Sequence, residues 1–147
     1  SSEPGYPKAM ENLQKIGVPR KIIAFVLPMG YNFNLDGSTL YLAIGAMFVS
    51  QAAGVHLDFP TLMALCFTLM LSSKGIAGVP RASLVILLAT VSAFHLPPEA
   101  VFLMLGIDEL MDMARTSINQ LGNCLATVVI AKWEGEFYPG IDQRGLD

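Results

Sequence analysis

The chain carries one polar stretch, Gly30-Tyr31-Asn32-Phe33-Asn34-Leu35-Asp36-Gly37-Ser38, inside an apolar segment that otherwise runs over residues 22–55. Glycine loosens the backbone, and Asn and Asp side chains compete for its hydrogen bonds, so a continuous helix is unfavourable here. The pattern predicts a helix, an unwound stretch and a second helix. An alternative interpretation is a turn over residues 34–37 that only caps the second helix.

The composition indicates that lipid is the solvent of this chain. Of its 147 residues, 53% are hydrophobic and 14% are charged, whereas a soluble domain carries about 25% charged residues. These values argue against a soluble enzyme, and the lack of a basic cluster in the sequence argues against a nucleic-acid partner. Cys66 and Cys124 lie alone in apolar runs, so we expect buried thiols and neither a disulfide nor a metal site.

Two short apolar stretches, Thr61–Ser73 and Ala82–Phe94, flank a tip that contains Gly, Pro, Lys74 and Arg81. At a rise of ~1.5 Å per residue each stretch spans roughly 20 Å, which is less than the ~30 Å of a hydrocarbon core. The sequence therefore predicts a re-entrant helical hairpin over residues 61–95, a feature that marks the binding sites of transporters. The alternative is one kinked span. Lys74 and Arg81 are expected to be solvated charges at the tip.

The remaining segments complete an all-α membrane fold. Residues 1–21 are a polar connector with a short helix near Ala9–Lys15, and residues 98–133 form a final transmembrane helix. Residues 137–147 are a polar tail that we expect to be disordered. The chain has no initiator Met, and its first residues lack the pattern of a signal peptide, so we expect a fragment of a longer protein.

A polar stripe follows one face of the final helix. Its members recur at spacings of four, three, one, three and four residues: Asp108, Asp112, Arg115, Thr116, Asn119 and Asn123. At about 100° per residue these positions share one face. Ionisable groups at membrane depth are costly and usually mark a substrate or ion path.

The residue types in the stripe suit an acidic amino acid. The planar fork of Arg115 can hold a carboxylate in two hydrogen bonds. Asp112 can bind an ammonium group or pair with Arg115, and Thr116 and Asn119 can bind the other end of a ligand. The alternative is a buried Asp112–Arg115 ion pair that joins helices.

The polar stretch in turn suits a small cation. Backbone carbonyls freed by unwinding, together with Asn34 and Asp36, are hard oxygen ligands appropriate for Na⁺.

Four segments, in order along the chain, resemble the dicarboxylate/amino acid:cation symporters, the glutamate transporter family. Residues 34–38 are similar to the family's Asn-Met-Asp-Gly-Thr motif, and residues 73–80 to the tip of its second re-entrant hairpin. Residues 108–123 are similar to its last transmembrane helix, and Ser1-Ser2 to the end of the serine-rich tip of its first hairpin.

The resemblance implies roles for individual residues. Arg115 would bind the side-chain carboxylate of the substrate, and Asp112 its amino group. The other substrate contacts would be Ser2, Ser38, Gly78, Val79, Thr116 and Asn119. One cation site would contain Asn34 and Asp36. A second would contain Gly30, Asn119 and Asn123, and Asp108 would be a nearby structural or ion-linked carboxylate.

The resemblance also implies a setting. The chain would be the C-terminal half of an elevator transport domain in a multi-pass plasma (inner) membrane protein, with the hairpin as a gate. The parent would be a homotrimer, would have an N-terminal scaffold outside this chain, and would use no cofactor besides a coupling cation, H⁺ or Na⁺.

Three residues depart from the family pattern. Asn123 replaces an Asp of sodium-coupled members, which favours H⁺ because a neutral amide binds Na⁺ more weakly. Arg81 replaces a Gly at the hairpin tip, and Leu35 replaces a Met near the cations. Asp112 favours an acidic amino acid over a substrate without an amine. A C4-dicarboxylate symporter and a binding-only membrane sensor or inactive fragment remain alternatives.

Overall fold

The computed structural model describes residues 3–75 and 82–145, whose regular elements are all helices, with no strand among them. The elements, in chain order, are η1 (Glu3–Gly5), α1 (Tyr6–Lys15), α2 (Arg20–Phe33), α3 (Asp36–Ala52), α4 (Phe59–Ser72), η2 (Ser73–Gly75), α5 (Ala82–Ala93), η3 (Pro98–Met104) and α6 (Leu105–Trp133). The prediction of an all-α fold is confirmed.

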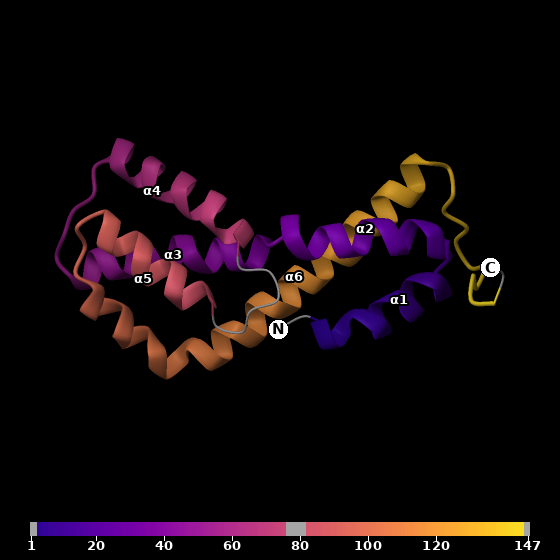
Figure 1. The fold of residues 1–147 in the computed structure, drawn as a ribbon, viewed down its shortest axis with the longest axis horizontal. Coiled ribbons are helices and arrows are strands. Elements are labelled where there is room, and N and C mark those ends of the chain that lie inside the picture. The colour runs from indigo at the N-terminus through magenta and orange to yellow at the C-terminus, as the bar shows by residue number, and fades with distance from the viewer. Residues whose placement is uncertain (1–2, 76–81, 146–147) are drawn as a thin grey trace.

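The long helix α6 crosses the whole molecule and packs on both α2 and α3 (Figure 1). At one end α3, α4, α5 and η3 form an apolar core around Leu42, Leu65 and Leu87. At the other end α1, α2 and the last turns of α6 form a second core around Leu13 and Ile23. The break between α2 and α3 lies between these two cores (Figure 1).

The break is shorter than the polar stretch that predicts it. Helix α2 continues to Phe33 and α3 begins at Asp36, so only Asn34 and Leu35 leave the helical conformation, with φ/ψ of −101°/76° and −111°/51°. The predicted unwinding over residues 30–38 is therefore wrong in extent. Polar groups from α6 satisfy the helix ends at the break, as described below, so the helices extend almost to each other.

The two arms of the predicted hairpin are observed as α4 and α5, which pack on each other and on α3. Leu69 of α4 and Val91 of α5 are buried in the same core as Val49 of α3. Of the predicted tip, residues 76–81, which include Arg81, lie outside the described residues.

The final helix differs at its start from the single helix predicted over residues 98–133. Residues 98–104 form the 3-10 helix η3, and the α-helix begins at Leu105. A 3-10 turn is common at the N-terminus of an α-helix, and hydrophobic periodicity does not distinguish the two. Among the described residues, no helix combines the length and the apolarity needed to cross a membrane.

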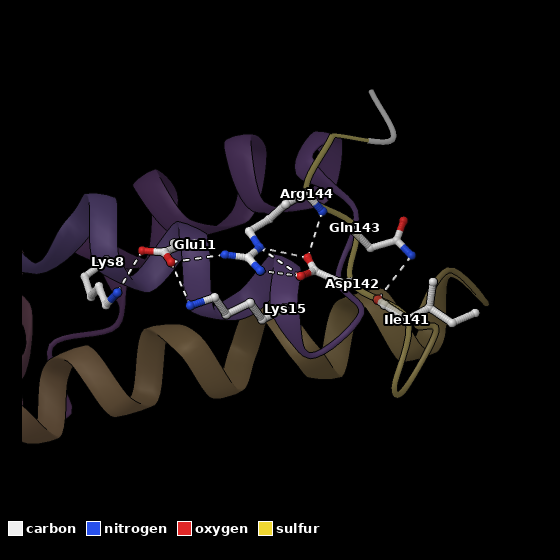
Figure 2. A network of polar contacts seen from close by, with 7 residues as sticks. All are labelled: Lys8, Glu11, Lys15, Ile141, Asp142, Gln143 and Arg144. Carbon is white, nitrogen blue, oxygen red and sulfur yellow. Dashed lines mark hydrogen bonds and ion pairs between the residues drawn. The ribbon is translucent and has the colours of Figure 1, made fainter.

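The described part of the polar tail, residues 137–145, contacts α1 and the turn that follows it, in contrast to the expected disorder. The Tyr138 N–H donates to the Gly17 carbonyl at 2.9 Å, and the Gln143 N–H donates to the Gln14 carbonyl at 2.9 Å. Figure 2 shows Arg144 between Asp142 and Glu11, with its Nη1 3.2 Å from Glu11 Oε1.

Neighbouring cations favour the ionised form of two carboxylates at this contact, Glu11 of α1 and Asp142 of the tail. Hydrogen bonds from Lys15 and Lys8 lower the pKa of Glu11 to about 2, and a hydrogen bond from Arg144 lowers the pKa of Asp142 to about 2. Both carboxylates therefore stay charged across the physiological pH range, and the contacts of the tail with α1 do not titrate there.

Helices α3 and α6 touch backbone to backbone at Gly37. A Cβ at Gly37 would lie 2.5 Å from the Arg115 carbonyl oxygen and 2.9 Å from the Arg115 Cα. Because backbone atoms cannot move as a flexible side chain does, this crossing requires glycine.

We expect Gly37→Ala to destabilise the protein by about 1–3 kcal/mol through overpacking at the crossing. The matched control is Gly106→Ala in α6, where a Cβ meets no atom within 4 Å and a helical Gly→Ala change is worth roughly 1 kcal/mol of stabilisation. Thermal unfolding of the purified protein in detergent compares the two. A melting temperature for Gly37→Ala at or above that of Gly106→Ala would contradict the proposed contact.

Candidate functional site

Buried polar side chains line the face of α6 that packs on α2 and α3. They are Asp108, Arg115, Asn119, Asn123 and Thr127, all at most 6% exposed. Their spacing in sequence places them on one side of the helix, as the polar stripe predicts. Asp112 and Thr116 belong to the same stripe and are half-buried.

Asn119 caps the N-terminus of α3. Its Oδ1 accepts hydrogen bonds from the N–H groups of Gly37 at 2.9 Å and Ser38 at 3.3 Å, and its Nδ2 donates to Ser38 Oγ at 2.9 Å. The first N–H groups of a helix have no intrahelical partner, and no side chain at the N-cap of α3 provides one. The interpretation of residues 34–37 as a self-capping turn is therefore wrong, because the cap comes from α6.

The Asn123 side chain is a hydrogen-bond donor to carbonyl groups at the α2 side of the break. The donors and acceptors around its amide assign the nitrogen to the side of the break, where it donates to the carbonyls of Gly30 at 3.1 Å and Asn34 at 3.3 Å. The side chain is 1% exposed. A buried amide therefore places a hydrogen-bond donor between the Gly30 carbonyl, which also accepts the Asn34 N–H, and the Asn34 carbonyl at the break.

Asn34 and Asp36 lie at the break on the side of α6. A Cβ at Gly122 would lie 2.6 Å from Asn34 Nδ2 and 3.1 Å from Asp36 Oδ2, so both side chains rest against that turn of α6. Asn34 is half-buried and Asp36 is exposed. The structure thus brings Gly30, Asn34, Asp36 and Asn123 into one neighbourhood.

Arg115 is enclosed by acidic and aromatic groups. Its Nε donates to Asp112 Oδ1 at 2.7 Å, and its Nη2 lies 2.5 Å from the same oxygen. The guanidinium carbon sits 4.5 Å above the centre of the Tyr41 ring, and the Tyr41 hydroxyl donates to Asp108 Oδ1 at 2.8 Å. Asp108 Oδ1 is 3.7 Å from Arg115 Nη1.

One donor of this guanidinium is left over. Among the described residues, the buried Arg115 Nη1 finds no hydrogen-bond acceptor. The Asp108 Oδ1 atom faces this nitrogen at 3.7 Å, beyond hydrogen-bond distance. A planar guanidinium can bind a carboxylate in two parallel hydrogen bonds. The Asp112–Arg115 pair lies within α6 itself and joins no helices, whereas Tyr41 joins α3 to this charged cluster of α6.

Several predicted site residues are not brought together here. Ser2, Gly78 and Val79 lie outside the described residues. Ser38 is at the site but is bonded to Asn119. Sequence reasoning missed Tyr41, which lies three residues after Ser38 and so on the same face of α3. It also expected Lys74 to be a solvated charge and did not find its partner: the ammonium makes a solvent-exposed hydrogen bond to the Phe33 carbonyl at 2.7 Å.

The architecture is a helical module with a broken helix and a buried charged stripe. Residues 1–133 match the model of the sodium:dicarboxylate symporter family. The chain belongs to the sodium:dicarboxylate symporter family.

Individual relatives are similar over most of this chain. It is 47% identical to a proton/sodium-glutamate symport protein of Geobacillus stearothermophilus, over 93% of this chain and 32% of that protein. It is 49% identical to the proton/glutamate-aspartate symporter of Escherichia coli, over 93% and 31%. It is 44% identical to a C4-dicarboxylate transport protein of Pseudomonas syringae, over 92% and 30%. The chain therefore spans about a third of the length of the curated relatives it matches.

Two substitutions at Tyr41 separate its two contacts. Tyr41→Phe keeps the ring under Arg115 and removes the hydroxyl that bonds Asp108, at an expected cost of about 1 kcal/mol. Tyr41→Leu also removes the cation–π contact and should cost roughly 1 kcal/mol more. Denaturant unfolding measures both, with the exposed Tyr138→Phe as control. Equal stability of Tyr41→Leu and Tyr41→Phe would show that the cation–π contact with Arg115 does not stabilise the protein.

Proposed function

We propose that the protein of which this chain forms a part is a secondary transporter that moves L-glutamate or L-aspartate together with a coupling cation. The observation that carries the proposal is the Arg115 guanidinium, which is 5% exposed and retains one donor without an acceptor among the described residues. The names of relatives at 47–49% identity, which are glutamate and glutamate-aspartate symporters, support the same substrate class.

Substrate binding would exchange one ion pair for two. Without substrate, Asp112 holds Arg115 through Nε and Nη2. The substrate ammonium would bind Asp112, and its side-chain carboxylate would bind the fork of Arg115, so neither buried charge is left unpaired. Ser38, Thr116 and Asn119 would complete the contacts, with Ser2, Gly78 and Val79 as proposed contributors from outside the described residues.

Asp112 favours an amino acid over a C4-dicarboxylate. A dicarboxylate has no ammonium group, so its second carboxylate would face the Asp112 carboxylate, and like charges in a site of low dielectric repel strongly. A C4-dicarboxylate substrate remains the second candidate, because a relative at 44% identity carries that name.

We propose H⁺, in preference to Na⁺, as the coupling cation. At Gly30 and Asn34 the carbonyls that could hold a cation accept hydrogen bonds from the Asn123 amide, which is neutral and buried. This amide offers no negative charge to Na⁺. Asn34 and Asp36 remain the proposed site if Na⁺ is carried, since one carboxylate and freed carbonyls suit that ion.

The proposed setting is a membrane, and the proposed activity is transport without catalysis. Residues 22–55 would be a broken span, residues 61–95 a re-entrant hairpin gate and residues 98–133 the final span, between the connector 1–21 and the tail 137–147. Asp108 and Arg115 of α6 would be compatible with lipid because they are buried on the face that packs on α2 and α3. The scaffold, the elevator movement, the trimer and the inner-membrane location belong to the whole protein.

The deciding experiment is uptake of labelled L-aspartate by the full-length protein in proteoliposomes. We expect accumulation under an imposed pH gradient that excess succinate does not block. Arg115→Ala should weaken uptake at least about thirtyfold, because a carboxylate loses its bidentate partner, while the exposed Lys8→Met should leave it unchanged.

Three other results of the uptake experiment would contradict parts of the proposed function. Binding of aspartate without accumulation would indicate a sensor, and block by succinate would indicate a C4-dicarboxylate symporter. Unchanged uptake in Arg115→Ala would remove the substrate role of that residue.

The cation proposal is tested by Asn123→Asp. A carboxylate at this buried position would face the carbonyls of Gly30 and Asn34, and a buried anion among oxygen ligands needs a cation. We expect aspartate binding by this variant to require Na⁺ and wild-type binding to be independent of Na⁺. Isothermal titration in sodium and in choline salts measures both, with Asn123→Ala as the neutral control. A Na⁺ requirement in the wild type would contradict the preference for H⁺.

A further inference from the structure

The last carbonyl groups of α2 place partial negative charge at the break. The last carbonyls of a helix have no intrahelical donors, and the aligned peptide dipoles place partial negative charge there. The Gly30 carbonyl accepts the Asn34 N–H at 2.8 Å. The chain leaves the helix at Asn34, so the carbonyl of Phe33, the last residue of α2, has no partner within the helix. The last turn of α2 contains no basic residue.

A lysine from another element supplies the missing positive charge. Lys74 Nζ donates to the Phe33 carbonyl oxygen at 2.7 Å, across 41 positions in sequence. Lys74 belongs to η2, which directly follows the first hairpin arm α4 and packs against both α2 and α3. The ammonium therefore reaches the helix end from the hairpin.

The neighbouring residue fixes the position from which Lys74 reaches. Ser73 is fully buried, and its Oγ donates to the Met70 carbonyl at 2.7 Å. The same oxygen lies 3.1 Å from Thr39 Oγ1 of α3. Ser73 thus contacts the helix that follows the break, and Lys74 contacts the helix that precedes it. Together they join the hairpin to both sides of the break.

We propose that Lys74 is a built-in cation: its ammonium takes the place at the C-terminal end of α2 that a dissolved alkali cation would otherwise fill, and Lys74 thereby helps to determine the ion specificity of the protein. Broken helices in transporters use freed carbonyls and half-helix C-terminal ends to coordinate Na⁺. An ammonium tethered by its own chain meets the same oxygen without needing Na⁺ from solution. The contact does not depend on the proposed transport function; only its consequence for the coupling ion does.

The test uses the purified full-length protein without substrate, because its readout then does not depend on transport. Lys74→Met removes the charge and retains an unbranched side chain that is one atom shorter, and Lys74→Arg retains a cation. The matched control is Lys132→Met, which removes an exposed lysine from the last turn of its own helix, α6. Melting temperatures are compared in sodium chloride and in choline chloride at equal ionic strength.

We expect Lys74→Met to melt below the wild type in choline and to recover in sodium. The wild type, Lys74→Arg and Lys132→Met should show a smaller and mutually equal response to Na⁺. An equal Na⁺ response of Lys74→Met and the wild type overturns the proposal, and so does a melting temperature in choline that Lys74→Met shares with Lys132→Met. If Lys74→Met does not fold, Lys74→Gln, which keeps a donor without the charge, must show the Na⁺ response instead.

A second readout separates this inference from the proposed function. In choline, Lys74→Met should bind L-aspartate about tenfold more weakly than the wild type, and Na⁺ should restore most of that affinity. A wild type that binds no acidic amino acid would refute the proposed function, while the salt dependence of unfolding would still decide the role of Lys74.

Discussion

The structure depends on a break in one helix, at Asn34 and Leu35, whose backbone groups must be satisfied from elsewhere. An interrupted helix exposes carbonyls at one end and N–H groups at the other, and burying them unpaired is costly. Here Asn119 accepts from the N-terminus of α3, Asn123 donates to the carbonyls near the end of α2, and Lys74 donates to the last carbonyl of α2. Each partner comes from a distant part of the sequence, so the break holds α6 and the hairpin in place as much as they hold it.

This requirement explains why the polar stripe of α6 combines two tasks. Asn119 and Asn123 satisfy the backbone of the broken helix, while Asp112 and Arg115, about one to three turns earlier, form the charged cluster. The backbone contact at Gly37 brings α3 directly against Arg115, and Tyr41, one turn further along α3, lies under its guanidinium. The charged cluster and the groups that satisfy the helix break therefore share one face of α6, and a change in either is expected to affect the other.

The donors at the helix break also bear on cation binding. Freed carbonyls at a helix break attract cations, and this chain offers them the Asn123 amide and the Lys74 ammonium. Both donors are part of the protein, so the break can be electrostatically complete without metal.

The sequence by itself determined the all-α class, the two hairpin arms, the existence of a helix break and the stripe on α6, because composition and periodicity carry these features. The family followed from the resemblance of four segments to known motifs, which the match over residues 1–133 confirms. Only the tertiary structure decided the extent of the break, the start of α6 in a 3-10 turn, the docking of the tail on α1 and the partners of Arg115. The Asn119 cap joins residues 81 and 82 positions apart, and Lys74 meets Phe33 across 41. A local pattern shows that a helix end needs a partner, but the packing of distant segments decides which side chain provides it.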